Sequence, residues 1–260
     1  MKKTIALLFG LFISVLLIQA QDLQEVLDTY FETIGQEKYL EHETMVAKGK
    51  SIQQGMETDF TVWQKRPNSL RLEVDIQGAT MVQVFDGEKG WYNAPWTGST
   101  DPIELSGWQL KTLERQSDFD GMIYNYKEKG YEAELIGTED MEGTEVYKLK
   151  FTDEDGNIYY YFIDADNFVL LKTTTKMKIG DSEVESDTYF SNYKEKDGYI
   201  MPFSVENRTN GQTVSQVNIE EVTFDEEIDD SKFKMPEKEE PMQEVEEQDK
   251  KEEQEEEEEK

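Results

Sequence analysis

The side chains that carry most enzyme chemistry are scarce in this sequence. It contains no cysteine and a single histidine, His42. Cysteine nucleophiles, thiolate metal sites and disulfides are therefore excluded, and a catalytic triad or multi-histidine metal site lacks its usual members. The sequence also has no Gly-rich phosphate loop, no His-Glu-x-x-His zinc motif and no Gly-x-Ser-x-Gly elbow. We therefore expect no enzyme, no metal site and no cofactor.

Acidic side chains are abundant but do not form a recognisable site. The chain has 58 Asp and Glu against 27 Lys and Arg, a net charge of −31. Carboxylate pairs occur throughout, so none stands out as a catalytic dyad. Residues 118–121 and 153–156 begin like calcium loops but lack the remaining ligand positions, and we interpret both as turns. A chain this negative repels nucleic-acid phosphates and anionic membrane surfaces, so we expect no nucleic-acid partner.

The remaining chemistry is apolar. Large apolar side chains alternate with polar ones along several segments, which predicts an inward-facing surface. They are Phe60, Val62, Leu70, Leu72, Met81, Phe85, Tyr160, Phe162, Met201 and Phe203. Such residues form either a filled core or a cavity that binds an apolar ligand, and composition does not choose between the two.

One cation shares the parity of two of these residues. Phe60, Val62 and Arg66 are separated by even numbers of positions, so a strand would direct all three to one face. If that face is the inner one, Arg66 is a cation at the rim of an apolar surface. There it would need a polar partner or water, because a desolvated charge is costly. The alternative is a strand-end arginine that points to solvent. His42, between two glutamates, is expected to be exposed.

The elements that position these residues follow from periodicity. Apolar residues at helical spacing predict a helix over 22–34, which Gly35 terminates. A weaker helix is predicted between 95 and 125. Elsewhere the period is two, and turn pairs separate the segments. The predicted strands are 42–52, 57–66, 70–76, 79–85, 131–138, 147–151, 157–164, 167–177, 183–194, 198–207 and 212–224.

This element order predicts a mainly β fold of about eleven antiparallel strands. The strands can close as a two-sheet sandwich or as one curved sheet that wraps a helix. The helix at 22–34 has one strongly apolar face, which needs a sheet to cover it. We therefore predict a curved antiparallel sheet, an incomplete barrel, with one or two covering α-helices.

The two ends of the chain have a different character. Residues 1–20 combine Lys2 and Lys3 with a short apolar stretch, which is typical of a signal peptide cleaved after Ala20. Residues 237–260 carry a net charge of −10 and almost no apolar side chain, so we expect a disordered acidic tail. The folded domain is then 21–236.

Two motifs resemble a known family. The first contains Trp63, Lys65, Arg66, Pro67 and Asn68, and the second contains Asp86, Gly87 and Trp91. Both are similar to motifs of the periplasmic lipoprotein carriers LolA and LolB and of outer membrane lipoprotein-sorting proteins. The Phe233-to-Pro236 segment is similar to that family's closing segment. The acidic tail is absent from the family pattern, and residues 96–130 do not align with it.

The resemblance implies an incomplete barrel whose apolar concave face holds the acyl chains of a lipoprotein or lipid. It implies a periplasmic carrier, a monomer, with an acylated lipoprotein or lipid as cargo and with membrane-bound donor and acceptor proteins as partners. The family's cargo-transfer arginine falls on Arg66. The alternative is a sensor or protein-interaction module that uses the same fold without transporting lipid.

Overall fold

The computed structural model describes residues 23–95, 101–180 and 182–236. The predicted signal peptide, residues 1–20, and the predicted acidic tail, residues 237–260, both lie outside the described residues. The described chain is mainly β, with thirteen antiparallel strands in one sheet. The strands are β1 Thr44–Gln53, β2 Met56–Lys65, β3 Ser69–Ile76, β4 Ala79–Phe85, β5 Gly90–Asn93, β6 Ile103–Glu104, β7 Glu132–Met141, β8 Thr144–Thr152, β9 Ile158–Asp164, β10 Leu170–Ile179, β11 Ser182–Lys196, β12 Tyr199–Thr209 and β13 Gln212–Phe224.

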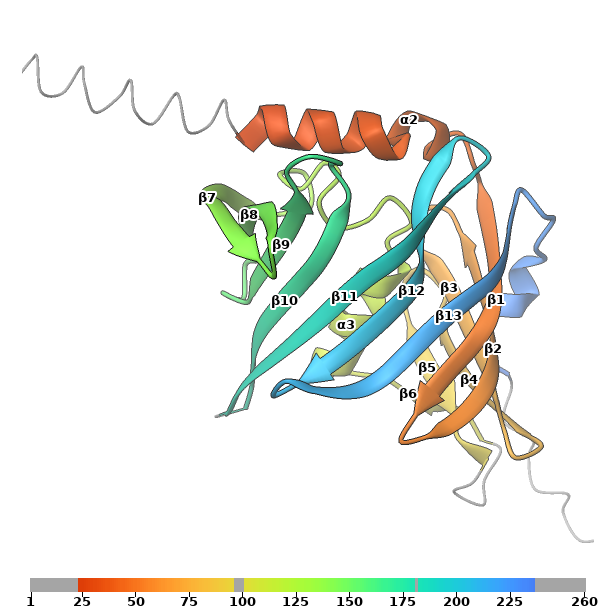
Figure 1. The fold of residues 1–260 in the computed structure, drawn as a ribbon. Helices are drawn as coiled ribbons and strands as arrows, with labels where there is room; N and C mark the ends of the chain where they lie inside the picture. Colours follow the sequence, from red (N-terminus) through yellow and green to blue (C-terminus); the bar gives the residue numbers. More distant parts are fainter. Residues whose placement is uncertain (1–22, 96–100, 181, 237–260) are drawn as a thin grey trace, which may run out of the picture.

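The order of the strands explains why the sheet is an incomplete barrel. Neighbours in the sheet are neighbours in sequence, except that β1 pairs with β13, so β6 and β7 occupy the two outer edges. The chain between these edges contains α3, Gly107–Ser117, which lies on the concave side of the sheet (Figure 1). The predicted curved sheet with covering helices is confirmed. Its strand count exceeds the expected eleven because β5 and β6 were not anticipated.

The predicted first helix is confirmed over 23–34 and covers one end of the sheet (Figure 1). Its apolar stripe packs against β8 and β9, and the shared cluster includes Leu27, Phe151 and Ile163. Burial of each such side chain stabilises the fold by about 1.5–3 kcal/mol. Gly35 ends the helix with φ 74°, and a Cβ there would lie 2.0 Å from the Gly198 carbonyl oxygen, so only glycine fits.

Two further elements fill the concave face. The short helix α2, Gln36–Tyr39, brings Tyr39 into a stack with Phe119, with ring centroids 5.0 Å apart. Both rings pack on β1, β12 and β13 through Ala47 and Val222, among others. Helix α3 packs its Leu113 against β3 and β4. We call α2 together with residues 118–121 the inner plug.

The convex face of β1–β5 is covered by the end of the described chain. Residues 225–235, which include the 3₁₀ turn η2, Asp230–Phe233, cross this face. Ile228 and Phe233 pack there against Trp91 and Val84. Away from the hairpin ends of β1–β4, the strands β1–β5 therefore carry packed elements on both faces. No helix among the described residues is long and apolar enough to cross a membrane.

Candidate functional site

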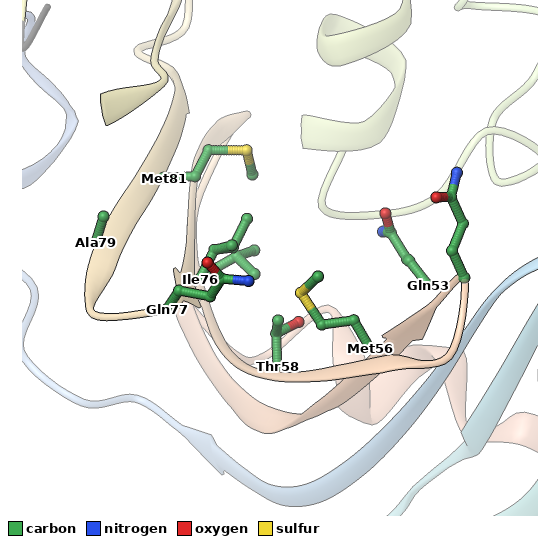
Figure 2. A pocket seen from close by; sticks show the side chains of 9 residues that line it. Gln53, Met56, Thr58, Ile76, Gln77, Ala79 and Met81 are labelled. Atoms are coloured by element: carbon green, nitrogen blue, oxygen red, sulfur yellow. The ribbon is translucent and has the colours of Figure 1, made fainter. Parts of the chain in front are cut away.

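An open groove lies on the concave face at the hairpin ends of β1–β4. Its volume is about 740 Å³, within the usual range of small-molecule sites. Figure 2 shows Met56 and Met81 directed into it, with Ile76 between them and Gln53 on the opposite side. The lining residues are Gln53, Gln54, Met56, Thr58, Val74, Ile76, Gln77, Ala79 and Met81.

Two tight hairpins build this groove. Gln54-Gly55 joins β1 to β2 and Gln77-Gly78 joins β3 to β4, and all four residues have positive φ. Two-residue turns of this kind match the twist of paired strands. The register then places Gln53 opposite Met56, and Ile76 opposite Ala79. Polar amides and thioethers therefore meet at one rim of the concave face.

Most of the ten predicted cavity residues form filled core instead. Met81 lines the groove. Five of the others are buried in the clusters beneath α3 and the inner plug or beside the groove, and two pack on those clusters from partly buried positions. The buried ones are Phe60, Leu70, Phe85, Met201 and Phe203, and the partly buried ones are Val62 and Leu72.

Tyr160 and Phe162 do not share the face of the other eight. Their strand neighbours Tyr159, Tyr161 and Ile163 pack in the inner cluster under the first helix. Because side chains alternate along a strand, Tyr160 and Phe162 point outwards. The Lys148 ammonium lies 5.2 Å from each ring centroid. Their predicted inward placement is therefore corrected: the aromatic rings are covered by lysine stems on the convex face.

The sequence did not reveal most of the groove. Met56 and the three glutamines come from strand ends and turns, where alternation is too short to assign a face. Thr58 and Ile76 lie in predicted strands, in parity with Phe60 and Leu70, but they were not among the predicted cavity residues. The signal that marks them is the pair of Gln-Gly turns, each of which requires positive φ at two positions.

Arg66 joins the end of β2 to the inner plug. Its side chain is 16% exposed and its guanidinium forms an ion pair with Asp120. The same group donates to the His42 carbonyl oxygen at 2.6 Å and to the Tyr39 carbonyl oxygen at 3.3 Å. Its carbon also lies 4.5 Å from the Phe119 ring centroid. Of the two placements that the sequence left open, the structure shows the partnered one, because the guanidinium binds a carboxylate, two carbonyl oxygens and an aromatic ring.

The inner plug is itself held together near Arg66. The Gln36 amide, on α2, donates to the Asp120 carbonyl oxygen at 3.3 Å. Lys129 binds Asp118 at 2.6 Å and the Gly121 carbonyl oxygen at 2.7 Å. Arg66 is therefore the cation that connects a two-part plug to the sheet, and charge-assisted bonds of this kind are strong while water is excluded.

The other motif residues build the frame around Arg66. Trp63 and Trp91 pack in the outer cluster under residues 225–235. Lys65 donates to the Ile228 carbonyl oxygen at 3.2 Å and so ties β2 to that covering segment. The motif thus fixes the sheet from its convex side while Arg66 binds on the concave side.

The remaining motif positions are turn residues near Arg66. Pro67 and Asn68 line a polar cleft of about 620 Å³ beside the inner plug. Asp86 accepts hydrogen bonds from the backbone of Glu88 and Lys89, and Gly87 has φ 103°. These residues shape two neighbouring turns and bring no acid–base group to the groove.

His42 is not exposed as the sequence suggested. Its side chain is 15% exposed, and its Nδ1 lies 2.8 Å from an Asp225 carboxylate oxygen. The imidazole stacks on Phe224 with centroids 4.2 Å apart. The hydrogen bond to His42 lowers the pKa of Asp225 below its usual value. His42 therefore joins the start of β1 to the end of β13, at the junction that closes the strand order.

Comparisons with known proteins agree with this architecture. A family model described only as an uncharacterized protein matches residues 74–237. The chain belongs to this uncharacterized family. No protein of curated function matches its sequence.

Solved structures show the same fold at low sequence identity. A LolA superfamily protein from Nitrosomonas europaea has a TM-score of 0.56 and 13% identity, with 80% of this chain and 96% of that chain covered. A DUF1329 family protein from Desulfovibrio piger has a TM-score of 0.56 and 14% identity, with 80% and 97% covered. A domain described as an outer membrane lipoprotein-sorting protein, from Vibrio parahaemolyticus, has a TM-score of 0.54 and 12% identity, with 80% and 94% covered. The chain therefore has the LolA superfamily fold.

Proposed function

We propose that this protein is a periplasmic carrier that binds the acyl chains of lipoproteins or lipids and delivers them towards the outer membrane. The observation that supports this most is the open groove of about 740 Å³, whose apolar lining comes from Met56, Val74, Ile76 and Met81. Thioether side chains adapt to flexible apolar ligands. The described residues hold no group of His, Cys, Asp and Glu able to bind a metal ion.

The carrier needs an apolar ligand to enter the groove, and this can be measured directly. An apolar fluorescent probe should bind the mature protein and be displaced by a long-chain acyl peptide. Met56→Asp and Met81→Asp place a charge in the groove and should each weaken probe binding at least about tenfold, which is roughly 1.4 kcal/mol.

Ile136→Asp is the matched control. Ile136 is an exposed apolar side chain on β7 that does not line the groove, so its replacement should leave probe binding unchanged. If the folded wild-type protein takes up no probe, the carrier proposal fails and the sensor or interaction-module alternative takes its place.

Release of cargo is the proposed role of Arg66. Its bonds to Tyr39 and Asp120 hold the inner plug closed. Arg66→Leu should keep or tighten cargo binding and slow transfer to an acceptor. Arg66→Lys should support transfer only in part, because an ammonium lacks the planar fork. Equal transfer by all three proteins would contradict this role.

The periplasmic location and the partners belong to the same proposal. Cleavage after Ala20 would release a monomer to the periplasm, where membrane-bound donor and acceptor proteins would exchange cargo with it. The mass of the exported protein decides the cleavage. Protein that is found in the membrane fraction and still carries its first twenty residues would contradict the proposed cleavage.

A further inference from the structure

The concave face carries a continuous polar row that the acyl-chain proposal does not use. Directly opposed residues of paired strands point to the same face. The register joins Gln53 to Ser215, Ser215 to Asn207, Asn207 to Thr188, and Thr188 to Thr173. Thr173 in turn opposes Tyr161, which packs in the inner cluster, so the whole row faces inwards. We call these five residues from Gln53 to Thr173 the polar row.

The polar row begins in the groove itself. Gln53 lines the groove and is also the register partner of Ser215. From there the row crosses β13, β12, β11 and β10, the strands that form the wall facing the viewer in Figure 1. An apolar groove and a polar wall therefore meet at one residue.

Hydrogen bonds fix the middle of the row and leave its end free. The Thr188 hydroxyl donates to the Asn207 side-chain oxygen at 2.9 Å, and the Asn207 amide donates to the Ser215 hydroxyl at 2.9 Å. Thr173 and the next inward pair, Thr175 and Ser186, form no side-chain hydrogen bond with the described residues. All three are partly exposed, so their hydroxyls remain available to a ligand.

The five residues of the polar row are uncharged. The ion pairs of the same strands, Lys172 with Asp187 and Lys176 with Glu185, lie at register positions that alternate with the row and therefore face outwards. Two cations lie on the inner side of these strands. Arg115 of α3 lies 3.7 Å from the Met177 sulfur, and Lys194 of β11 opposes Met201 and lies 4.2 Å from the Phe203 ring centroid. The Asp153 carboxylate accepts a hydrogen bond from the Tyr159 hydroxyl, and its charge is opposite in sign to that of Arg115.

These observations define one class of ligand, given the proposed function on which this step rests. We propose that the cargo is an amphiphile with an uncharged, hydroxyl-bearing headgroup, and that the polar row binds the headgroup while the groove binds the acyl chain. Hydroxyl and amide side chains both donate and accept, as a sugar or glycerol headgroup requires. A net charge of −31 disfavours an anionic headgroup.

The test compares ligands that share a twelve-carbon chain and differ in the headgroup, each used below its micelle concentration. Dodecyl maltoside should displace the fluorescent probe at least about tenfold more strongly than dodecyl phosphate, since each net hydrogen bond contributes about 0.5–1.5 kcal/mol. Maltose alone should not displace the probe, which separates a lipid headgroup from a free sugar.

The decisive variant is Thr173→Val with Thr175→Val. It keeps the β-branched shape of two residues whose hydroxyls have no partner in the described protein, so the fold is preserved. Dodecyl maltoside should bind about fivefold more weakly to it, and dodecyl phosphate should bind as to the wild type. Thr61→Val is the control, because Thr61 opposes Lys48 on the outer face.

The outcomes separate the two proposals. If the probe binds and both twelve-carbon ligands displace it equally in every variant, the polar row has no role in recognition and the carrier proposal stands. If dodecyl phosphate is preferred, the uncharged headgroup is wrong. If no probe binds at all, the groove does not hold acyl chains and both proposals fail.

Discussion

Replacing Arg66 tests how firmly the inner plug is attached to the sheet. Arg66→Leu removes a guanidinium that serves Asp120, the His42 carbonyl and the Tyr39 carbonyl. A hydrogen bond to a charged group contributes about 1.5–3 kcal/mol, but the three bonds share one cation and are not additive. Asp120 is 28% exposed and can regain water after the change. The expected loss is therefore about 2–4 kcal/mol of unfolding free energy.

The assay is thermal and denaturant unfolding combined with hydrogen exchange. A loss of this size lowers the midpoint of a domain this large by roughly 5–12 °C. Exchange should accelerate in residues 36–42 and 118–131, which Arg66 and Lys129 hold, more than in the strands. In a double-mutant cycle with Asp120→Asn, the two changes should be non-additive by about 1 kcal/mol or more.

Arg71 provides a matched control on the other face of the sheet. Its side chain is 18% exposed, pairs with Glu73 and donates to the Lys232 carbonyl oxygen at 2.9 Å. Arg71→Leu should cost a similar free energy but accelerate exchange in residues 228–235 instead. If Arg66→Leu loses less than about 0.5 kcal/mol, or if both variants loosen the same segments, Arg66 is not the attachment of the plug.

Three further predictions concern single side chains. Phe162→Ala should lower the unfolding free energy by about 3 kcal/mol, because the ring is buried. It should leave probe binding intact, because the ring faces outwards. Weaker probe binding at unchanged stability would contradict this placement. Burial raises the pKa of Tyr199 to about 12. Its contribution to stability is therefore present below pH 10 and should be lost as the pH rises towards 12. Tyr199→Phe should reduce this loss of stability in unfolding curves measured across that range. The hydrogen bond to His42 depresses the pKa of Asp225, which gives stability that is present above the usual carboxyl pKa and lost as the pH falls below about 4. The difference in unfolding free energy between wild type and His42→Ala should therefore be larger at pH 5 than at pH 3. An equal difference at both pH values would refute the pairing.

The fold was largely predictable because burial leaves a periodic trace in long elements. The first helix buries Leu23, Val26 and Leu27 at helical spacing, and eleven strands alternate over seven residues or more. β5 and β6 are too short for such a trace. α2 has only four residues. Its position depends on Gly35 and on the stack of Tyr39 with Phe119, a residue that is distant in sequence.

The candidate site was less predictable, for two physical reasons. Residues 158–163 are six apolar or aromatic side chains in succession, so alternation could not assign Phe162 to a face. The structure resolves the choice through Lys148 and Lys172, whose stems cover the outer ring. The partners of Arg66 lie 24 to 54 positions away in sequence, a range over which spacing carries no information.

The groove and the inner plug are parts of one surface, and Phe60 separates them. On β2, Thr58 lines the groove and Val62 packs against the cluster that contains Tyr39, while Phe60 lies between them with 8% exposure. About 13 Å of strand joins Thr58 to Val62. In the proposed carrier, a ligand confined to the groove would reach Phe60 and leave the bonds of Arg66 intact. A longer acyl chain would meet the plug next, and it would gain further apolar contact only if the plug moved and the bonds of Arg66 broke. The proposed role of Arg66 in release therefore predicts that replacing it alters the transfer of long acyl chains more than that of short ones, although Arg66 does not line the groove.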